Sequence, residues 1–284
     1  MAKPSYPHYA WAAGHALVLL GSVYSLLGLV TFSSRTKSYY LAYAGALVSW
    51  GIVVYKSLGT PQASKAWVQR ALLDENVQYL LLALYWFMQK PIYVTLLPFA
   101  TFSLFHTLTF LRTSVLPKVP SAPAKGAAAQ HHQQQQQQAL TGGAKLSKMI
   151  QVWVKANYEK AMQFVAFVEV MVVFGRLVLG AITFQNSLLS PLFFAHFLRL
   201  RFYLSPPTRQ AFSYVNAQID HYVAANPKVP AGVKKGVKIV RELIARYSES
   251  IISVQQPGAA GAGAGAAGAG RGTAAAAAEA HRAR

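Results

Sequence analysis

The chain has 284 residues, no cysteine and a formal net charge of +19. Hydrophobic residues make up 54% of it and charged residues only 12%, whereas soluble domains carry about 25% charged residues. This composition excludes an ordinary soluble domain, and the lack of cysteine excludes disulfides and thiolate metal sites. The length leaves room for one membrane domain with its tails.

A first membrane hairpin is predicted from two apolar runs, residues 10–32 and 38–55, joined by a short polar connection. A helix needs about 20 apolar residues to cross the hydrocarbon core of a bilayer, and both runs are close to that length. The first run is much longer than the apolar part of a secretory signal. We therefore expect it to be retained as a signal anchor, with the second run returning across the membrane.

A second hairpin is predicted at residues 77–89 and 91–111, on either side of the break Gln89-Lys90-Pro91. Proline lacks a backbone donor and disfavours helix in the residue before it, so the chain should turn there. The first arm is short and the second is of full spanning length, which predicts a wedge-like hairpin.

The linker between the hairpins is predicted to hold a helix on the membrane surface. Thr60-Pro61 is typical of a helix start. Apolar residues follow it at helical spacing, at Ala63, Ala66, Trp67 and Ala71. Residues 1–118 are thus expected to form the two hairpins with one interfacial helix.

A second membrane region is expected at residues 145–204, with apolar runs at Met162–Phe184 and Leu188–Leu204. The first run contains Glu169 and Arg176, the only charges in a stretch otherwise predicted to be buried. They are two helical turns apart on one face, so each should meet a partner on a neighbouring helix. Intramembrane charge hints at function, but both residues could also hold helices together or snorkel to the interfaces.

The orientation follows from basic residues, which stay on the cytosolic side in short loops. With a cytosolic N-terminus, the linker with Lys56, Lys65 and Arg70 is cytosolic, and so is the basic loop after the second hairpin. We expect four to six membrane segments and an even number of crossings, which leaves the basic C-terminus in the cytosol.

Two segments have low complexity and are predicted to be disordered. Residues 119–144 contain a run of six glutamines, and residues 255–284 are rich in glycine and alanine. His131 and His132 lie next to each other in the first segment, where such a pair does not indicate a metal site. No metal ion and no cofactor are expected.

Residues 205–254 are predicted to form basic amphipathic helices. In the last of them, 100° of rotation per residue places the apolar side chains on one, membrane-inserting face. They are Val233, Val237, Val240, Ile244, Tyr247 and Ile251. The cations lie elsewhere and suit an anionic leaflet, at about 1 kcal/mol for each basic residue. They are Lys234, Lys235, Lys238, Arg241 and Arg246.

Two other interpretations of this helix stay open. It could pack on the protein's own membrane domain, or its basic cluster at residues 234–238 could bind a nuclear import receptor or nucleic acid. Direct contact with nucleic acid is not expected, because most cations flank apolar segments and no zinc-finger spacing or aromatic-basic motif is present.

No catalytic constellation is visible, so we expect a protein that is not an enzyme. The eight acidic residues are scattered, and no serine or histidine lies in a nucleophile motif. The competing class is a transporter or channel component, or its regulator, that uses Glu169 and Arg176. No repeated pair of interrupted helices, as in transporters, is evident.

Two sets of sequence blocks carry a family resemblance. The first contains Arg70-Ala71-Leu72-Leu73-Asp74-Glu75, Tyr79-Leu80-Leu81, Pro98-Phe99 and Phe102-Ser103-Leu104-Phe105-His106. The second contains Phe164-Val165-Ala166, Glu169, Leu188-Leu189-Ser190-Pro191-Leu192 and Phe197-Leu198-Arg199-Leu200-Arg201-Phe202. These blocks resemble the transmembrane protein 33 family, which includes a fungal pore-membrane nucleoporin. The resemblance covers roughly residues 10–118 and 150–252, and the glutamine-rich insert and the tail depart from it.

The resemblance implies an all-helical protein of the endoplasmic reticulum and nuclear envelope. It implies roles in organising the reticulum network and in nuclear pore distribution or biogenesis, nucleoporin and reticulon-type partners, and no catalytic residues. We expect an all-α, multi-pass membrane-shaping scaffold. Its hairpins would occupy one leaflet more than the other, and its C-terminal helix would prefer curved, anionic membrane.

Overall fold

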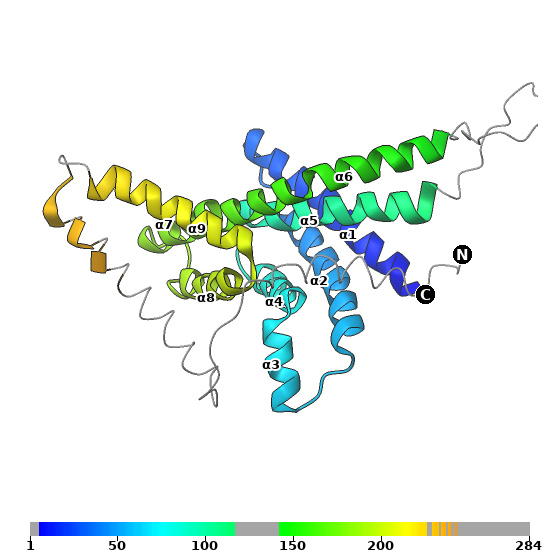
Figure 1. Ribbon diagram of the computed structural model, residues 1–284, viewed down its shortest axis with the longest axis horizontal. Coiled ribbons are helices and arrows are strands. Elements are labelled where there is room, and N and C mark those ends of the chain that lie inside the picture. The colour runs from blue at the N-terminus through cyan, green and yellow to red at the C-terminus, as the bar shows by residue number, and fades with distance from the viewer. Residues whose placement is uncertain are drawn as a thin grey trace, which may run out of the picture. The chain divides into compact units, whose positions relative to one another are not determined.

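The computed structural model describes residues 6–116, 142–225, 229–232, 234–236, 238–239 and 242. No strand occurs in this part of the chain, so the all-α class expected from the sequence is confirmed. The helices in Figure 1 are α1 (Tyr6–Val30), α2 (Thr36–Leu58), α3 (Lys65–Leu73), α4 (Glu75–Met88), η1 (Tyr93–Thr95), α5 (Leu96–Phe110), η2 (Leu111–Val115), α6 (Gly142–Phe167), η4 (Val168–Val173), α7 (Phe174–Ile182), α8 (Leu189–Leu204), α9 (Pro206–Ile219) and η5 (Asp220–Ala224). The chain divides into two compact units, Met1–Tyr222 and Val223–Arg284, and α1 to α9 belong to the first.

Four helical stretches in the described residues are long and apolar enough to cross a membrane. They are Tyr6–Val30, Thr36–Leu58, Tyr93–Val115 and Gly143–Ile182. The helix α4 has only 14 residues, or about 21 Å, which is less than the about 30 Å of a hydrocarbon core. The second hairpin thus has one short and one long arm.

The helix in the linker between the hairpins begins later than predicted. α3 starts at Lys65 instead of Thr60-Pro61, so the predicted start was wrong. Ser64 is the N-cap, and its hydroxyl accepts a hydrogen bond of 3.2 Å from the Trp67 amide. This satisfies a backbone donor that the first turn would otherwise leave unpaired. The side chain of Asp74 caps α4 in the same way, so the two helices follow one another directly.

Glycines bring α1 and α2 into close contact. A Cβ atom added at Gly14 would lie 2.7 Å from the Gly45 carbonyl oxygen, and one at Gly45 equally close to the Gly14 oxygen. One at Gly21, seven residues after Gly14, would lie 2.9 Å from the Ser38 oxygen. Small residues let two backbones approach where lipid provides no hydrophobic force between helices. The first hairpin is therefore held by backbone proximity.

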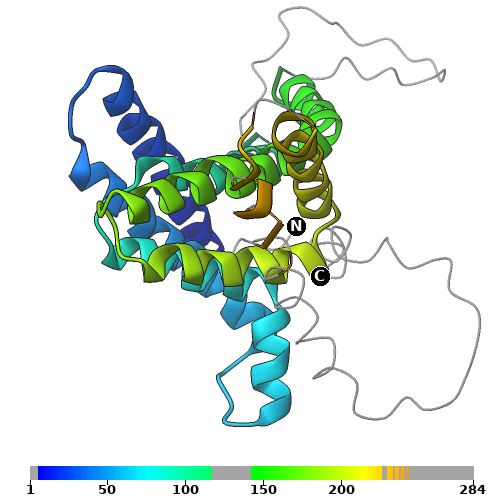
Figure 2. The same ribbon diagram turned by 90° about the vertical axis from the view of Figure 1, so that its left-hand side faces the viewer.

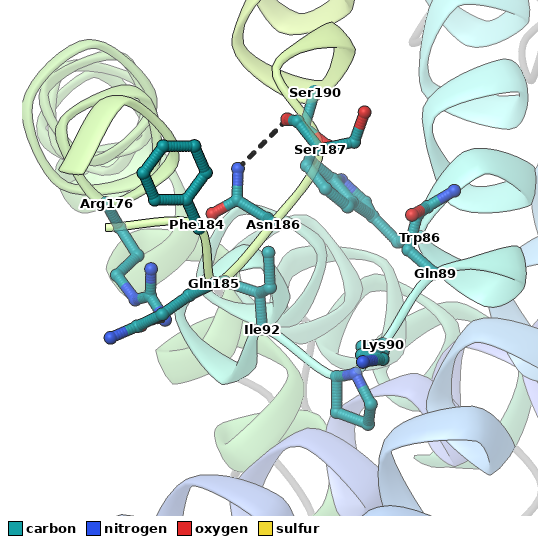
Figure 3. Close-up of a pocket in the computed structure, with 11 residues that line it drawn as sticks. Trp86, Gln89, Lys90, Ile92, Arg176, Phe184, Gln185, Asn186, Ser187 and Ser190 are labelled. Carbon is teal, nitrogen blue, oxygen red and sulfur yellow. Dashed lines mark hydrogen bonds between the residues drawn. The ribbon is translucent and has the colours of Figure 1, made fainter. Parts of the chain in front are cut away.

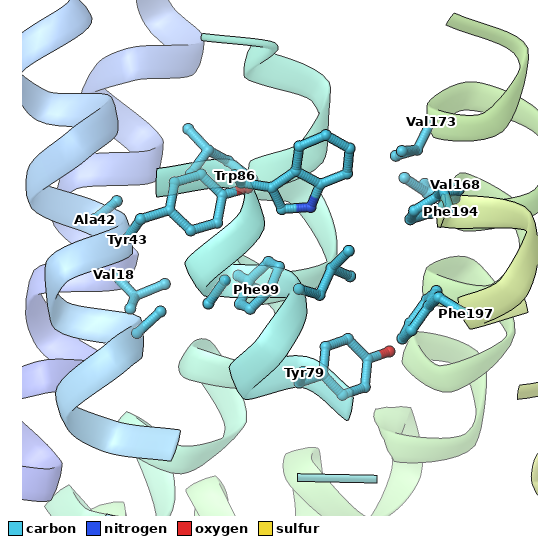
Figure 4. Close-up of a cluster of buried hydrophobic side chains, with 14 of the residues drawn as sticks. Val18, Ala42, Tyr43, Tyr79, Trp86, Phe99, Val168, Val173, Phe194 and Phe197 are labelled. Carbon is cyan, nitrogen blue, oxygen red and sulfur yellow. The ribbon is translucent and has the colours of Figure 1, made fainter. Parts of the chain in front are cut away.

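Aromatic side chains form the core between this hairpin and the rest of the first unit (Figure 4). Trp50 of α2 meets Phe99 of α5 edge to face, with ring centroids 5.3 Å apart, and Phe99 meets Tyr79 of α4 at 5.7 Å. Tyr43, also buried, hydrogen-bonds Thr95 over 2.7 Å. Edge-to-face pairs at this spacing contribute about 0.5–1.5 kcal/mol each beyond burial. The tyrosine hydroxyl is satisfied within the core.

Three short connections lie at the same end of the bundle, which we call the turn end: residues 31–35, 89–92 and 183–188. The Tyr93 hydroxyl accepts a hydrogen bond of 3.1 Å from the Arg35 amide, which joins the first two connections. The Tyr85 hydroxyl, near the end of α4, donates to Ser190 at the start of α8 over 2.8 Å and joins the third. The longer segments, α3, the start of α6 and α9, belong to the opposite end.

The helices α1 and α7 finish at the turn end with the same backbone motif. The Ser33 amide donates to the Gly28 carbonyl over 2.9 Å, and the Gln185 amide donates to the Gly180 carbonyl over 2.7 Å. The residues before these amides, Phe32 and Phe184, are left-handed, with φ of 50° and 58°. This is a Schellman motif, whose left-handed position usually holds glycine. Here it holds phenylalanine, 97% exposed at residue 32 and 89% exposed at residue 184.

Candidate functional site

The predicted membrane-inserting face lies outside the described residues, as do two of the predicted cations. These residues are Val233, Val237, Val240, Arg241, Ile244, Arg246, Tyr247 and Ile251. Of the remaining cations, Lys235 and Lys238 are exposed and Lys234 is half-buried. The Lys234 amide donates to the Pro230 carbonyl over 3.3 Å. The amphipathic helix stays a prediction from the sequence.

Glu169 is completely buried and has partners on two neighbouring helices, as expected for an intramembrane acid. The Tyr79 hydroxyl of α4 donates a hydrogen bond of 2.5 Å to Glu169 Oε1. On the other side, Arg201 Nε of α8 lies 3.7 Å from Glu169 Oε2. Glu169 belongs to η4, a π-helical stretch inside the long helix from α6 to α7. Such π-bulges are frequent where a side chain has a special role.

Arg201 connects Glu169 to a second acid nearer the surface. Its Nη1 lies 3.3 Å from Glu75 Oε2, and its own side chain is 5% exposed against 43% for Glu75. Its guanidinium carbon lies 5.3 Å from the ring centroid of Tyr79, within cation–π range. Glu75, Tyr79, Glu169 and Arg201 form what we call the buried ionic cluster. It joins α4, η4 and α8 at one point.

The chemistry of the buried ionic cluster favours a structural role. A buried carboxylate is stable only when it is paired and hydrogen-bonded, and Glu169 has both kinds of partner. In the part of the chain that the structure describes, no group of three or more metal-ligating side chains is present. All four members lie in the sequence blocks of the family resemblance, and this was the signal that could have identified Glu75, Tyr79 and Arg201 beforehand.

Arg176 does not meet Glu169, and its partner differs from the expected one. Its Nη2 donates a hydrogen bond of 2.9 Å to Gln185 Oε1, in the connection after its own helix and not on a neighbouring helix. The reason is the Schellman motif, which folds Gln185 back over the last turns of α7. The two predicted intramembrane charges therefore belong to two separate sites.

A family model described as Transmembrane protein 33/Nucleoporin POM33 matches residues 2–250. The chain belongs to this family. It is 34% identical over 235 residues to Nucleoporin POM33 of Chaetomium thermophilum, with 78% of this chain and 79% of the relative covered. It is 29% identical over 256 residues to Tetra-spanning protein 1 of Schizosaccharomyces pombe, with coverages of 87% and 86%. To Pore membrane protein of 33 kDa of Saccharomyces cerevisiae it is 26% identical over 258 residues, with coverages of 86% and 85%.

No solved structure matches the chain. The family match confirms the resemblance found in the sequence blocks. The matched residues include the first and second hairpins and the buried ionic cluster. These relatives of the POM33 family carry the names of membrane and pore-membrane proteins, and none of the names denotes an enzyme. Together with four helices of spanning length, the match identifies a multi-pass membrane protein.

Proposed function

We propose that this chain is a non-enzymatic membrane-shaping scaffold that contributes to nuclear pore distribution or biogenesis and to organisation of the reticulum network. Family membership is consistent with a location in the membranes of the endoplasmic reticulum and nuclear envelope. The observation that carries the shaping role is the unequal distribution of helices between the two ends of the bundle.

At the turn end, the connections are only a few residues long. The opposite end carries α3, with nine residues, the start of α6, and α9, with 14 residues. In Figure 2, α9 turns away from the direction of α8 where α8 ends. Helices that lie across one surface of a membrane expand that leaflet more than the other, which favours curvature.

The helix α3 has the character of an interfacial helix. Val68 and Leu72 are 45% and 51% exposed, while Lys65 and Arg70 are exposed beside them. The Trp67 indole donates to the Leu58 carbonyl over 3.2 Å, which attaches α3 to the end of α2. This exposed apolar surface next to basic residues suits the headgroup region of the cytosolic leaflet in the orientation predicted from the sequence.

The C-terminal segment would add a second contribution. Its predicted apolar face would insert about 5–10 Å into a curved, anionic leaflet, and its cations would bind lipid headgroups or an import receptor. Relatives named nucleoporin and pore membrane protein support nuclear pore proteins as partners. Reticulon-type proteins are the partners we propose in the wider reticulum.

The test is super-resolution localisation of the tagged full-length chain against pore and reticulum-tubule markers. We compare it with Val240→Glu/Ile244→Glu, with the apolar control Val240→Leu/Ile244→Leu, and with a chain ending at Leu204. We expect pore-associated puncta for the full chain and the leucine control only. Puncta that persist in the glutamate variant would refute targeting by the C-terminal helix, and uniform reticulum signal for every chain would refute the pore role.

The competing class, a transporter or channel that uses Glu169 and Arg176, receives less support. Glu169 is completely buried and bonded to Tyr79, and Arg176 lies in another site. A substrate flux or current in proteoliposomes that is lost on Glu169→Gln would favour that class over a scaffold.

A further inference from the structure

A cavity of about 420 Å³ opens at the turn end, between the end of α4 and the connection from α7 to α8 (Figure 3). Two cationic side chains, Lys90 and Arg176, line it, together with the apolar side chains of Trp86, Ile92 and Phe184. Its size lies within the usual range of small-molecule sites, about 300–1,000 Å³. The cavity is separate from the buried ionic cluster, which lies toward the other end of α4.

The charge in this cavity is uncompensated. None of the lining residues is acidic. Neither Lys90 nor Arg176 forms an ion pair with a carboxylate of the described residues. Glu169, the acid closest to Arg176 along the helix, is already bonded to Tyr79 and faces Arg201. Two cations without an acid between them make a site for an anion.

Neutral donors supplement the two cations. Arg176 uses the Oε1 atom of Gln185 as its acceptor, which leaves the Gln185 amide nitrogen free to donate to a ligand. Ser190 accepts from Tyr85, so its own hydroxyl proton remains available. Asn186 holds the connection in place, because its Nδ2 donates to the carbonyls of Leu177 and Ser187, each over 3.2 Å. These donors and the two cations offer the positive charge and the hydrogen bonds that a phosphate group accepts.

The position of the cavity indicates where that phosphate comes from. Lys90 lies three residues before Tyr93 in the chain. The Tyr93 hydroxyl accepts a hydrogen bond from the Arg35 amide, in the connection between the two helices of the first hairpin. The cavity is therefore level with the ends of the membrane-spanning helices, at the depth of the lipid headgroups. Phe184 is exposed at its edge and offers an apolar wall to the upper part of an acyl chain.

We propose that this cavity binds the phosphate-bearing headgroup of one membrane phospholipid. Lys90 and Arg176 bind the phosphate oxygens, Gln185 and Ser190 donate hydrogen bonds to the headgroup, and Phe184 contacts the acyl chain. The site is independent of the curvature role, because it uses no residue of α3, α9 or the C-terminal segment.

The experiment is native mass spectrometry of the full-length protein released from detergent, after incubation with one of three probes. Dioleoylphosphatidylinositol carries phosphate and chains, dioleoylglycerol carries the chains alone, and inositol 1-phosphate carries the phosphate alone. We expect one molecule of the phospholipid to be retained and little of the other two. Equal retention of dioleoylglycerol would overturn phosphate recognition, and equally strong binding of inositol 1-phosphate would assign the site to a soluble phosphate instead.

Matched charge variants localise the binding. Lys90→Gln/Arg176→Gln should lower phospholipid retention by at least roughly tenfold. Lys37→Gln/Lys56→Gln likewise removes two positive charges, both exposed and neither from the cavity, and should leave retention unchanged. Lys90→Gln alone, at an exposed position where misfolding is not expected, should lower it about fivefold. Wild-type retention in both cavity variants, or an equal loss in the control, would overturn the proposal.

Discussion

Tyr79 and Glu169, 90 residues apart in the sequence, share a hydrogen bond of 2.5 Å inside the bundle. Tyr79 belongs to the short helix α4, which is not long enough to span the bilayer by itself. The bond fixes α4 to the long helix that contains η4, and Arg201 adds α8 at the same point. These polar contacts add to the apolar core contacts of Tyr79 and Trp86 in holding the short arm of the second hairpin.

The three charges of the buried ionic cluster should differ in their effect on stability. Arg201→Met leaves the buried Glu169 carboxylate without its cation and should lower the free energy of unfolding by about 3–5 kcal/mol. Glu169→Gln leaves Arg201 paired with Glu75 and should cost less. Glu75→Gln removes a half-exposed partner and should cost under about 1 kcal/mol. Thermal unfolding in detergent, monitored by circular dichroism, measures this order of stability losses.

The double variant Glu169→Gln/Arg201→Met is the control for that order. It removes both buried charges, so it should be more stable than Arg201→Met alone. Additive losses would show that the two charges do not interact across the cluster.

Alanine at Gly45 should disrupt the first hairpin. Its Cβ would lie 2.7 Å from the Gly14 carbonyl oxygen, so α1 and α2 would have to separate at a cost of about 1–3 kcal/mol. Gly51, on the same helix, has open space around its Cβ position. Gly51→Ala should therefore raise the stability by about 0.5–1 kcal/mol. A lower melting temperature for Gly45→Ala together with a higher one for Gly51→Ala would support close backbone contact. Changes of the same sign in both variants would contradict it.

The left-handed conformation of Phe184 can be tested with two variants that both lack the ring, so that the loss of ring contacts is the same in each. Phe184→Gly and Phe184→Ala both remove the ring, but only alanine keeps a Cβ atom at φ of 58°. Glycine should be more stable than alanine by about 1 kcal/mol. If the alanine variant is as stable as the glycine variant, or more stable, the α7 terminus does not adopt this motif in solution.

Gly180 should tolerate no side chain, because its Cβ would collide with the Asn186 side chain. Gly180→Ala would displace Asn186 from the Leu177 carbonyl and should speed hydrogen exchange at residues 183–188. The matched change is Gly175→Ala, where nothing lies within 4 Å of the added atom. This control should leave exchange in the connection unchanged, and faster exchange in both variants would contradict the specific role of Gly180.

The helical class and the spanning stretches could be predicted because apolar run length and proline breaks are local signals. The approach of α1 and α2 was missed, although Gly14, Gly21 and Gly28 recur every seven residues on one face. Arg176 was paired wrongly with a neighbouring helix because its partner depends on a chain reversal at Phe184, a residue that does not usually take a left-handed conformation.

The buried ionic cluster shows a different limit of sequence reasoning. Glu169 could be recognised as unusual from its apolar surroundings, but its partners come from two other helices at separations that no local pattern encodes. Glu75 and Arg201 resemble ordinary charges at the ends of apolar runs. Only the fold shows that one arginine serves both acids.

Phe32 and Phe184 end two different helices in the same way and at the same end of the bundle, with both rings directed outward. An exposed phenylalanine ring is wholly apolar, so it resists movement of its helix end out of the bilayer into water. The two rings therefore oppose any rise of the turn end out of its bilayer. A membrane of another thickness would then change the immersion of α3 and α9 at the far surface, while the turn end keeps its depth.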